Sequence, residues 1–136
     1  MMRALGVPPA RIAKAWPLVE GWIASALERG KGNVSPADVR RCLGMATMQL
    51  WLAWTGKRDK GCCITEIVSD ARGKTCNLVC VAGLEFEQWQ PLTEIIKDFA
   101  RAHGCVRLEA SGRAGWERLV KQDGWHNIRT TIEMEL

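Results

Sequence analysis

The chain has 136 residues, a net charge of +4 and 47% hydrophobic residues. This length is typical of one domain and allows a hydrophobic core that needs no disulfide or metal. No apolar run approaches the roughly 20 residues of a membrane span, and the first residues are too weakly apolar for a secretory signal. We therefore expect a single domain, residues 1–136, inside a cell or inside a particle made in one, without membrane contact.

The positive charge is mild, and its densest cluster is formed by Lys57, Arg58 and Lys60. A polar turn between two predicted strands accounts for this cluster. Proteins that bind nucleic acid usually carry a basic stripe along one face. A nucleic-acid accessory role would therefore rest on basicity alone, and we do not expect nucleic acid as a partner.

The six cysteines raise the question of a disulfide or zinc site. Four of them lie in strand-like segments, and there is no CxxC pair. Cys76 and Cys80 would share one strand face about 13 Å apart, at roughly 3.3 Å per residue. That separation is too large for two sulfurs that bind one zinc at about 2.3 Å. We predict free thiols and no metal.

The N-terminal third is predicted to be helical. Residues 1–10 contain one glycine and two prolines, which predicts an irregular start. Apolar residues then recur at helical spacing, and Pro17 should interrupt or begin a helix, so we place the main helix at 17–29. A second helix should begin after Ser35, because Ser35-Pro36-Ala37-Asp38 is a variant of the capping box.

Three antiparallel strands should follow. Residues 48–55 alternate between two faces, and residues 56–61 are predicted to close a hairpin. The next strand covers residues 62–69, and the four residues from Asp70 to Gly73 form a second turn. Residues 75–82 end in an almost entirely apolar run, which is typical of a central strand.

The last third is predicted to form a helix, a strand, a shorter helix and a final strand. Residues 91–103 place apolar side chains on one stripe, Gly104 provides a left-handed stop, and residues 106–110 alternate. The shorter helix should end at Gly124. Residues 125–136 alternate throughout, which predicts the last strand. The core is expected to contain Ile95, Phe99, Leu108, Leu119 and Ile132.

The motif AxxHGCxxLEAxGRxGWER and the pair Gly124-Trp125 resemble the C-terminal half of the GNAT acyltransferase family, whose last strand opens with a Gly-aromatic pair. More narrowly, the motif is similar to small GNAT-like proteins encoded in tailed-phage genomes. The resemblance implies an α+β fold with one central, mostly antiparallel, twisted sheet flanked by helices. In this chain two N-terminal helices would come first.

The resemblance also implies a loop that binds the pyrophosphate of acyl-CoA at the start of the long helix, usually through closely spaced glycines. The corresponding residues here are Gly83, Leu84, Glu85, Phe86 and Glu87. This loop looks vestigial, since it has one glycine, no cation and two carboxylates that would repel a diphosphate. We therefore expect acetyl-CoA to bind weakly, with a dissociation constant in the millimolar range or above.

Many members of the family use a tyrosine to protonate the leaving thiolate. It lies four residues before the glycine of the Gly-aromatic pair, which is Gly124 in this chain. Val120 holds that position, and the sequence contains no tyrosine at all. Cys105 or a water molecule could supply the proton instead. Because these alternatives are weak, no residue is assigned here as catalytic.

A general base is easier to place than an acid. Glu66 and Asp70 lie on and after the second predicted strand, and either carboxylate could accept a proton from an amine. A solvated or turn carboxylate is the more ordinary interpretation of both. His103, on an apolar stripe, is more ordinary as a partly buried histidine, and His126 has no supporting neighbour.

Four residues are candidates for contact with another chain. Trp22 and Trp51 lie off the apolar faces of their own elements, and exposed aromatic residues often dominate interfaces. Arg113 could bind an anion next to Trp116. The alternative is a strand-to-helix turn that needs two glycines, with Trp116 in the core.

We therefore expect a non-enzymatic, cofactor-free virion or assembly component of a phage, located in the virion or the host cytoplasm. Its partners would be other phage structural proteins, with a second copy of the chain as a further candidate. The alternative is an acyl-CoA-dependent N-acetyltransferase that uses acetyl-CoA despite its atypical loop. The nucleic-acid accessory protein is the third hypothesis.

Overall fold

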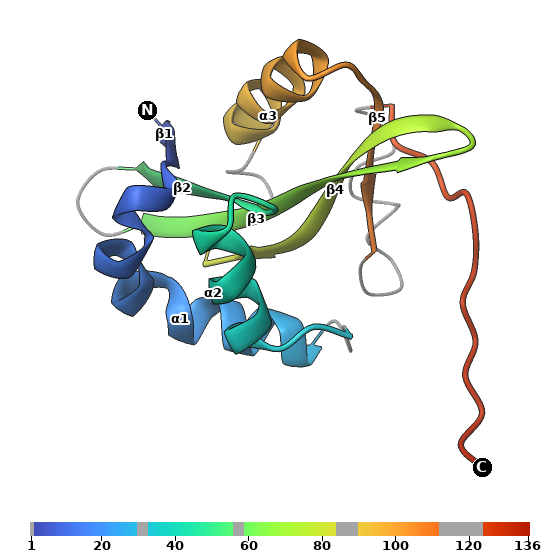
Figure 1. The fold of residues 1–136 in the computed structure, drawn as a ribbon, viewed down its shortest axis with the longest axis horizontal. Coiled ribbons are helices and arrows are strands. Elements are labelled where there is room, and N and C mark those ends of the chain that lie inside the picture. Colours follow the sequence, from blue (N-terminus) through green and yellow to red (C-terminus); the bar gives the residue numbers. More distant parts are fainter. Residues whose placement is uncertain (1, 30–32, 56–58, 84–89, 112–123) are drawn as a thin grey trace.

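The computed structural model describes residues 2–29, 33–55, 59–83, 90–111 and 124–136. Within these ranges one mixed sheet has the strand order β1-β2-β3-β4-β5. Helices α1 and α2 cover one face of this sheet, and α3 lies on the other (Figure 1). The elements in chain order are β1 (Met2–Val7), η1 (Pro9–Arg11), α1 (Ile12–Arg29), α2 (Pro36–Gly44), β2 (Gln49–Thr55), β3 (Asp59–Asp70), β4 (Gly73–Ala82), α3 (Gln90–Ala102) and β5 (Cys105–Ala110).

The expected irregular start, and with it the expectation that two helices come first, is wrong. β1 is a strand that pairs antiparallel with β2, from Met2 opposite Thr55 to Val7 opposite Leu50. An edge strand is held mainly by its backbone, so Gly6 is tolerated there, and Pro8 lies just outside it. The prolines instead begin η1, whose first residue is Pro9.

The first helix begins earlier than expected, because Pro17 lies inside α1. A proline within a helix removes one hydrogen bond and costs about 3 kcal/mol. Buried side chains on both sides of Pro17 offset this cost, since each is worth roughly 1.5–3 kcal/mol. They are Ile12, Trp16, Val19, Ile23 and Leu27.

The capping box of α2 is confirmed. Ser35 Oγ accepts a hydrogen bond from the Asp38 N–H, and Asp38 Oδ2 accepts one from the Ser35 N–H, both at 3.1 Å. The Asp70–Gly73 turn is confirmed too, with Gly73 at a φ of +107°. The hairpin at 56–61 is shorter than predicted, because β3 already begins at Asp59 and Gly61 is buried within it.

The sheet separates two buried clusters. On the α1/α2 face lie the apolar residues of α1 with Val39, Leu43, Leu50 and Ile64. On the α3 face, Trp51 packs with buried side chains of α3. The predicted core differs from this arrangement: Ile95 is 37% exposed and Ile132 is 91% exposed. Phe99 and Leu108 are partly buried, and Leu119 lies outside the described residues. The buried positions of α3 are Leu92, Thr93, Ile96 and Ala100.

The predicted final strand is also wrong. Residues 125–136 adopt no strand, and the segment runs away from the sheet to the C-terminus (Figure 1). Trp125 packs against the α3-side cluster, while the side chains of Ile132 and Met134 are exposed. The predicted helix before Gly124 falls on residues 116–123, outside the described part of the chain.

Candidate active site

The middle of β4 contains a β-bulge. Ile64 of β3 pairs with Cys80, and Thr65 pairs with Leu78, so Val79 is one extra residue on β4. A bulge bends its strand and increases the local twist. It also puts two consecutive side chains on one face: Val79 and Cys80 both pack against the α1/α2-side cluster.

A fork in the sheet begins at this bulge. β5 runs parallel to β4 from Lys74 opposite Cys105 to Leu78 opposite Ala110, and the pairing ends there. Residues 79–82 continue to pair with β3 through Cys80, Val81 and Ala82. On their other edge, the backbone groups of these residues meet no strand in the part of the chain that the structure describes. This edge leads to Gly83, which has a φ of +79°.

The bulge corrects the expected placement of two cysteines. Cys76 packs on the α3 face and Cys80 on the α1/α2 face, so they do not share a face. All six cysteines are free thiols. Among the described residues there is no group of three or more side chains suited to hold a metal.

A row of polar side chains crosses β3, β4 and β5 next to the bulge. Glu66 pairs with Asn77, and Asn77 pairs with Glu109, so the three side chains point to the same face. Ile64, two residues before Glu66, places that face on the α1/α2 side. Asn77 Nδ2 donates a long hydrogen bond of 3.5 Å to Glu66 Oε1. All three residues are partly buried.

Glu66 and Glu109 differ in how their charge is balanced. Glu109 Oε1 accepts a hydrogen bond from Arg72 at 3.3 Å, and its Oε2 accepts one from Arg129 at 3.0 Å. In the described part of the chain, Glu66 has only the contact with Asn77. Glu66 is therefore the carboxylate of the row that remains available to accept a proton.

The other acid–base candidates lie away from the fork. Asp70 Oδ1 accepts a hydrogen bond from the Arg72 N–H at 2.7 Å, so this carboxylate stabilises the turn between β3 and β4. His103 is exposed, and its Nδ1 lies 2.9 Å from the Phe99 carbonyl oxygen, to which it donates. His126 is exposed in the C-terminal segment.

The proposed proton donor Cys105 is at the wrong end of its strand. It begins β5 opposite Lys74, whereas the fork opens beyond Ala110, about 16 Å away at roughly 3.3 Å per residue. Cys80 lies at the fork itself, a position that the sequence did not suggest. Burial raises the pKa of its thiol to about 11. Transfer of its proton to a thiolate of ordinary pKa near 8.5 would cost about 3 kcal/mol, so Cys80 is a poor acid.

The sequence did not indicate the buried hydrogen-bond network that lies under α3. Trp51 Nε1 donates to Thr65 Oγ1 at 2.9 Å, and Thr65 Oγ1 donates to Gln49 Oε1 at 2.8 Å. Phe99 of α3 packs edge-on against Trp51, with ring centroids 5.1 Å apart. Strict alternation in residues 48–55 did place Trp51 on the second face. The expectation that this face is open is wrong, because α3 covers it and Trp51 is 7% exposed.

Several predicted site residues have no described placement. Of the vestigial loop, only Gly83 is described, and Leu84, Glu85, Phe86 and Glu87 lie outside the described residues. Arg113, Val120 and Trp116 lie outside them as well. Trp22 is partly buried against the α1/α2-side cluster. Its role in contact with another chain stays a prediction, as do the phage partners and the second copy.

Comparison with known proteins gives a consistent result at the level of the fold. No protein-family model matches the sequence, and no curated protein matches it. Solved structures do match the fold. An aminoglycoside acetyltransferase from an uncultured soil metagenomic sample is 14% identical, with a TM-score of 0.68, over 100% of this chain and 99% of that chain.

Two further structures have similar scores. A ribosomal-protein-alanine N-acetyltransferase from Brucella melitensis biovar Abortus 2308 is 12% identical, with a TM-score of 0.66, over 100% of this chain and 99% of that chain. AAC(6')-Iy, in complex with the bisubstrate analog CoA-S-monomethyl-acetylneamine, is 11% identical, with a TM-score of 0.66, over 100% and 98% of the two chains.

These matches contradict the leading functional hypothesis. The similar structures are described as acetyltransferases, which favours the enzymatic alternative over a non-enzymatic virion component, and nothing in them points to a phage. Within the described residues no helix is both long and apolar enough to cross a membrane. Identities of this size establish architecture only. The chain has a GNAT-like fold.

Proposed function

We propose that the protein is an acyl-CoA-dependent N-acetyltransferase. The observation that supports this most is the fork at Val79, where β4 leaves β5 and one backbone edge has no strand partner among the described residues. The edge lies in a fold that matches acetyltransferases over nearly the whole chain. Glu66 and Asn77 border the fork on the face of α1 and α2.

The residues at the fork fit an acyl-CoA molecule. Backbone N–H and C=O groups need hydrogen-bond partners. The edge of residues 79–82 that meets no other described strand presents such groups in an extended arrangement. The pantetheine arm is an extended chain with amide groups, so it would pair with this edge as an added strand does. Its sulfur end would then lie towards the bulge and Glu66.

The start of α3 fits the diphosphate in one respect. A helix N-terminus presents unsatisfied N–H groups and the positive end of the helix dipole, and the first turn of α3 contains no acidic residue. Glu85 and Glu87 precede this turn in sequence. We expect their charge to weaken binding without abolishing it, because exposed like charges at about 4 Å cost only about 1 kcal/mol per pair.

Glu66 is assigned as the base that accepts a proton from the amine of the acceptor. Asn77 would hold the carboxylate in place through the contact at 3.5 Å. When bound, acyl-CoA would supply the activated acyl group as a thioester. Among the described residues no side chain near the fork is suited to return a proton, so solvent takes this role.

Calorimetry with acetyl-CoA at low salt tests the binding step directly. A dissociation constant in the micromolar range supports the proposal, and absence of binding at 1 mM overturns it, because that limit corresponds to only about −4 kcal/mol. The variant Glu85→Gly with Glu87→Gly should bind more tightly than the native chain.

Release of free thiol in the presence of amine acceptors tests the chemical step. Glu66→Gln should lower kcat by about 10²–10⁴-fold, the usual contribution of a general base, while the dissociation constant of acetyl-CoA stays unchanged. Asp70→Asn, in the turn at the end of the same strand, is the matched control and should retain activity. Equal losses of kcat in Glu66→Gln and Asp70→Asn would show that Glu66 is not the general base.

A further inference from the structure

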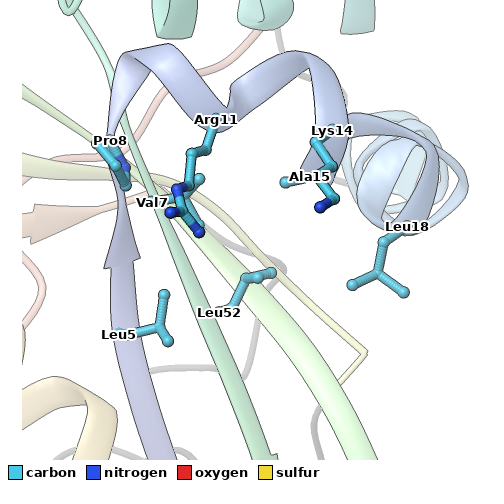
Figure 2. Close-up of a pocket in the computed structure, with 8 residues that line it drawn as sticks. All are labelled: Leu5, Val7, Pro8, Arg11, Lys14, Ala15, Leu18 and Leu52. Carbon is cyan, nitrogen blue, oxygen red and sulfur yellow. The ribbon is translucent and has the colours of Figure 1, made fainter.

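A groove lies on the α1/α2 face, at the opposite edge of the sheet from the fork. It is bordered by β1, η1, the start of α1 and β2, it is open to solvent on one side, and it has a volume of about 540 Å³ (Figure 2). Both β2 and β3 separate its edge strand β1 from β4. The groove is therefore a different site from the proposed active site. It is lined by Leu5, Val7, Pro8, Arg11, Lys14, Ala15, Leu18 and Leu52.

The floor and one wall of the groove are apolar. Leu5 and Leu52 come from β1 and β2 and are paired across the two strands, while Leu18 lines the groove from α1 (Figure 2). Leu5 is 44% exposed and Leu18 is 47% exposed. Two large aliphatic side chains that border one hollow give an apolar ligand a surface to cover.

Among the described residues that line it, the groove has two cations and no carboxylate. Arg11 and Lys14 extend from η1 and α1, and both line the groove (Figure 2). In the described part of the chain, neither side chain forms an ion pair or a hydrogen bond. Other arginines of the fold do have carboxylate partners: Arg41 pairs with Asp38, and Arg72 with Glu109.

We propose that this groove binds an anionic amphiphile, specifically a single-chain carboxylate of medium length. The carboxylate would lie between Arg11 and Lys14, and the hydrocarbon chain would cover Leu5, Leu18 and Leu52. The volume of about 540 Å³ lies within the roughly 300–1,000 Å³ of small-molecule sites, which are mostly apolar with few polar groups.

Two other classes of ligand fit this groove less well. A polyanion such as nucleic acid would use a longer basic stripe and leave the aliphatic floor uncovered. A membrane surface would meet a flat apolar face flanked by cations, whereas the cations here line a groove. The combination of two cations with an aliphatic floor in an open groove matches a ligand that has one acidic group and one hydrocarbon chain.

Calorimetry with sodium decanoate tests the proposal, with decylamine and inorganic phosphate as ligands that each lack one of the two features. Decanoate should bind with a dissociation constant below 1 mM, and the other two should not bind at that concentration. Binding of decylamine with equal affinity, or of phosphate alone, would overturn the proposal. So would binding to vesicles with anionic lipid in the absence of any binding to monomeric decanoate.

Variants locate the site. Arg11→Gln with Lys14→Gln should raise the dissociation constant of decanoate about tenfold, which corresponds to about 1.4 kcal/mol. Arg29→Gln with Arg101→Gln removes the same charge elsewhere and should leave it unchanged. Leu18→Ser, at an exposed position of α1, should weaken binding without unfolding the domain. An equal effect of both charge pairs would contradict the proposal. Acetyl-CoA binding should be unaffected by decanoate, so the two proposals fail independently.

Discussion

β2 and residues 125–136 have the same alternating sequence pattern and different structures. β2 pairs with β1 on one edge and with β3 on the other, and helices cover both of its faces. The C-terminal segment places Ile128, Ile132 and Met134 on one face of the alternation, yet it adopts no strand, and these apolar side chains remain exposed. Alternation therefore defines two faces of an extended segment, and it does not determine which strands or helices will meet them.

The largest expected effect is at the centre of β2. Trp51→Ala should destabilise the fold by about 3–5 kcal/mol, since it removes a buried aromatic ring and leaves Thr65 without its donor. Urea denaturation measures this change. Trp51→Phe, which keeps a ring against Phe99 but loses the hydrogen bond and part of the buried indole volume, should cost less than Trp51→Ala. A loss below 1 kcal/mol for Trp51→Ala would mean that the second face of β2 is as open as the C-terminal segment.

Two neighbouring residues of α3 sharpen the comparison on the helix that covers this face. Ile96→Ala should cost about 2–5 kcal/mol, because Ile96 is fully buried. Ile95→Ala makes the same chemical change at an exposed position and should cost less than about 1 kcal/mol. Chemical denaturation of both variants gives the difference. Equal costs would show that α3 is rotated from the orientation described.

A smaller effect is expected at the capping box of α2. Ser35→Ala should cost about 1 kcal/mol, the usual value of a lost N-cap. The pKa of Asp38 is lowered below 3.8. The largest cause is the hydrogen bond from the Ser35 N–H, and the hydrogen bonds with the Ser35 hydroxyl and Arg41 contribute less. A lowered pKa stabilises the folded state above that value, and this stabilisation is lost as the pH falls through the folded-state pKa.

Thermal denaturation as a function of pH checks the sign. The difference in stability between the native chain and Asp38→Asn should be constant near neutral pH and should shrink below pH 3.8. An increase in that difference towards acid pH would contradict the assignment of the cap.

The smallest effect is expected in the C-terminal segment. Ile132→Thr should change the free energy of unfolding by no more than about 0.5 kcal/mol, because Ile132 is 91% exposed. The same measurement on Leu50→Thr in β2 provides the contrast at a buried position of the α1/α2 face. A cost of 2 kcal/mol or more for Ile132→Thr would show that this segment pairs with a strand in solution.

The sequence predicts those features that depend on neighbouring residues. The cap at Ser35, the turn before Gly73 and the stop at Gly104 each need a few adjacent positions, and all three are present. It does not predict features that depend on distant contacts. Burial of α1 on both sides of Pro17 outweighs a local cost, and β1 exists because a strand far along the chain pairs with it.

The same distinction holds for the candidate site. Glu66 could be selected from the sequence as one carboxylate among several, but its position at the fork depends on the bulge at Val79. No residue type marks that bulge, since the run LVCV is equally suited to a regular strand. In a regular strand Cys76 and Cys80 would lie on one face, and only the bulge places them on opposite faces. Likewise, Arg11 and Lys14 share a groove with Leu52 only because β1 brings the start of the chain beside β2.

The pairing of β1 with β2 has a consequence for how the chain folds. Val7 meets Leu50 and Met2 meets Thr55, with the whole of α1 and α2 between them, whereas the β3–β4 hairpin closes through a short turn. Closing a long loop costs more entropy before any contact forms, so non-local pairing slows folding. During synthesis β1 emerges before β2 and cannot pair with it until β2 has been made. We expect the hairpin to form early and the N-terminal strand to be the last part of the sheet to close.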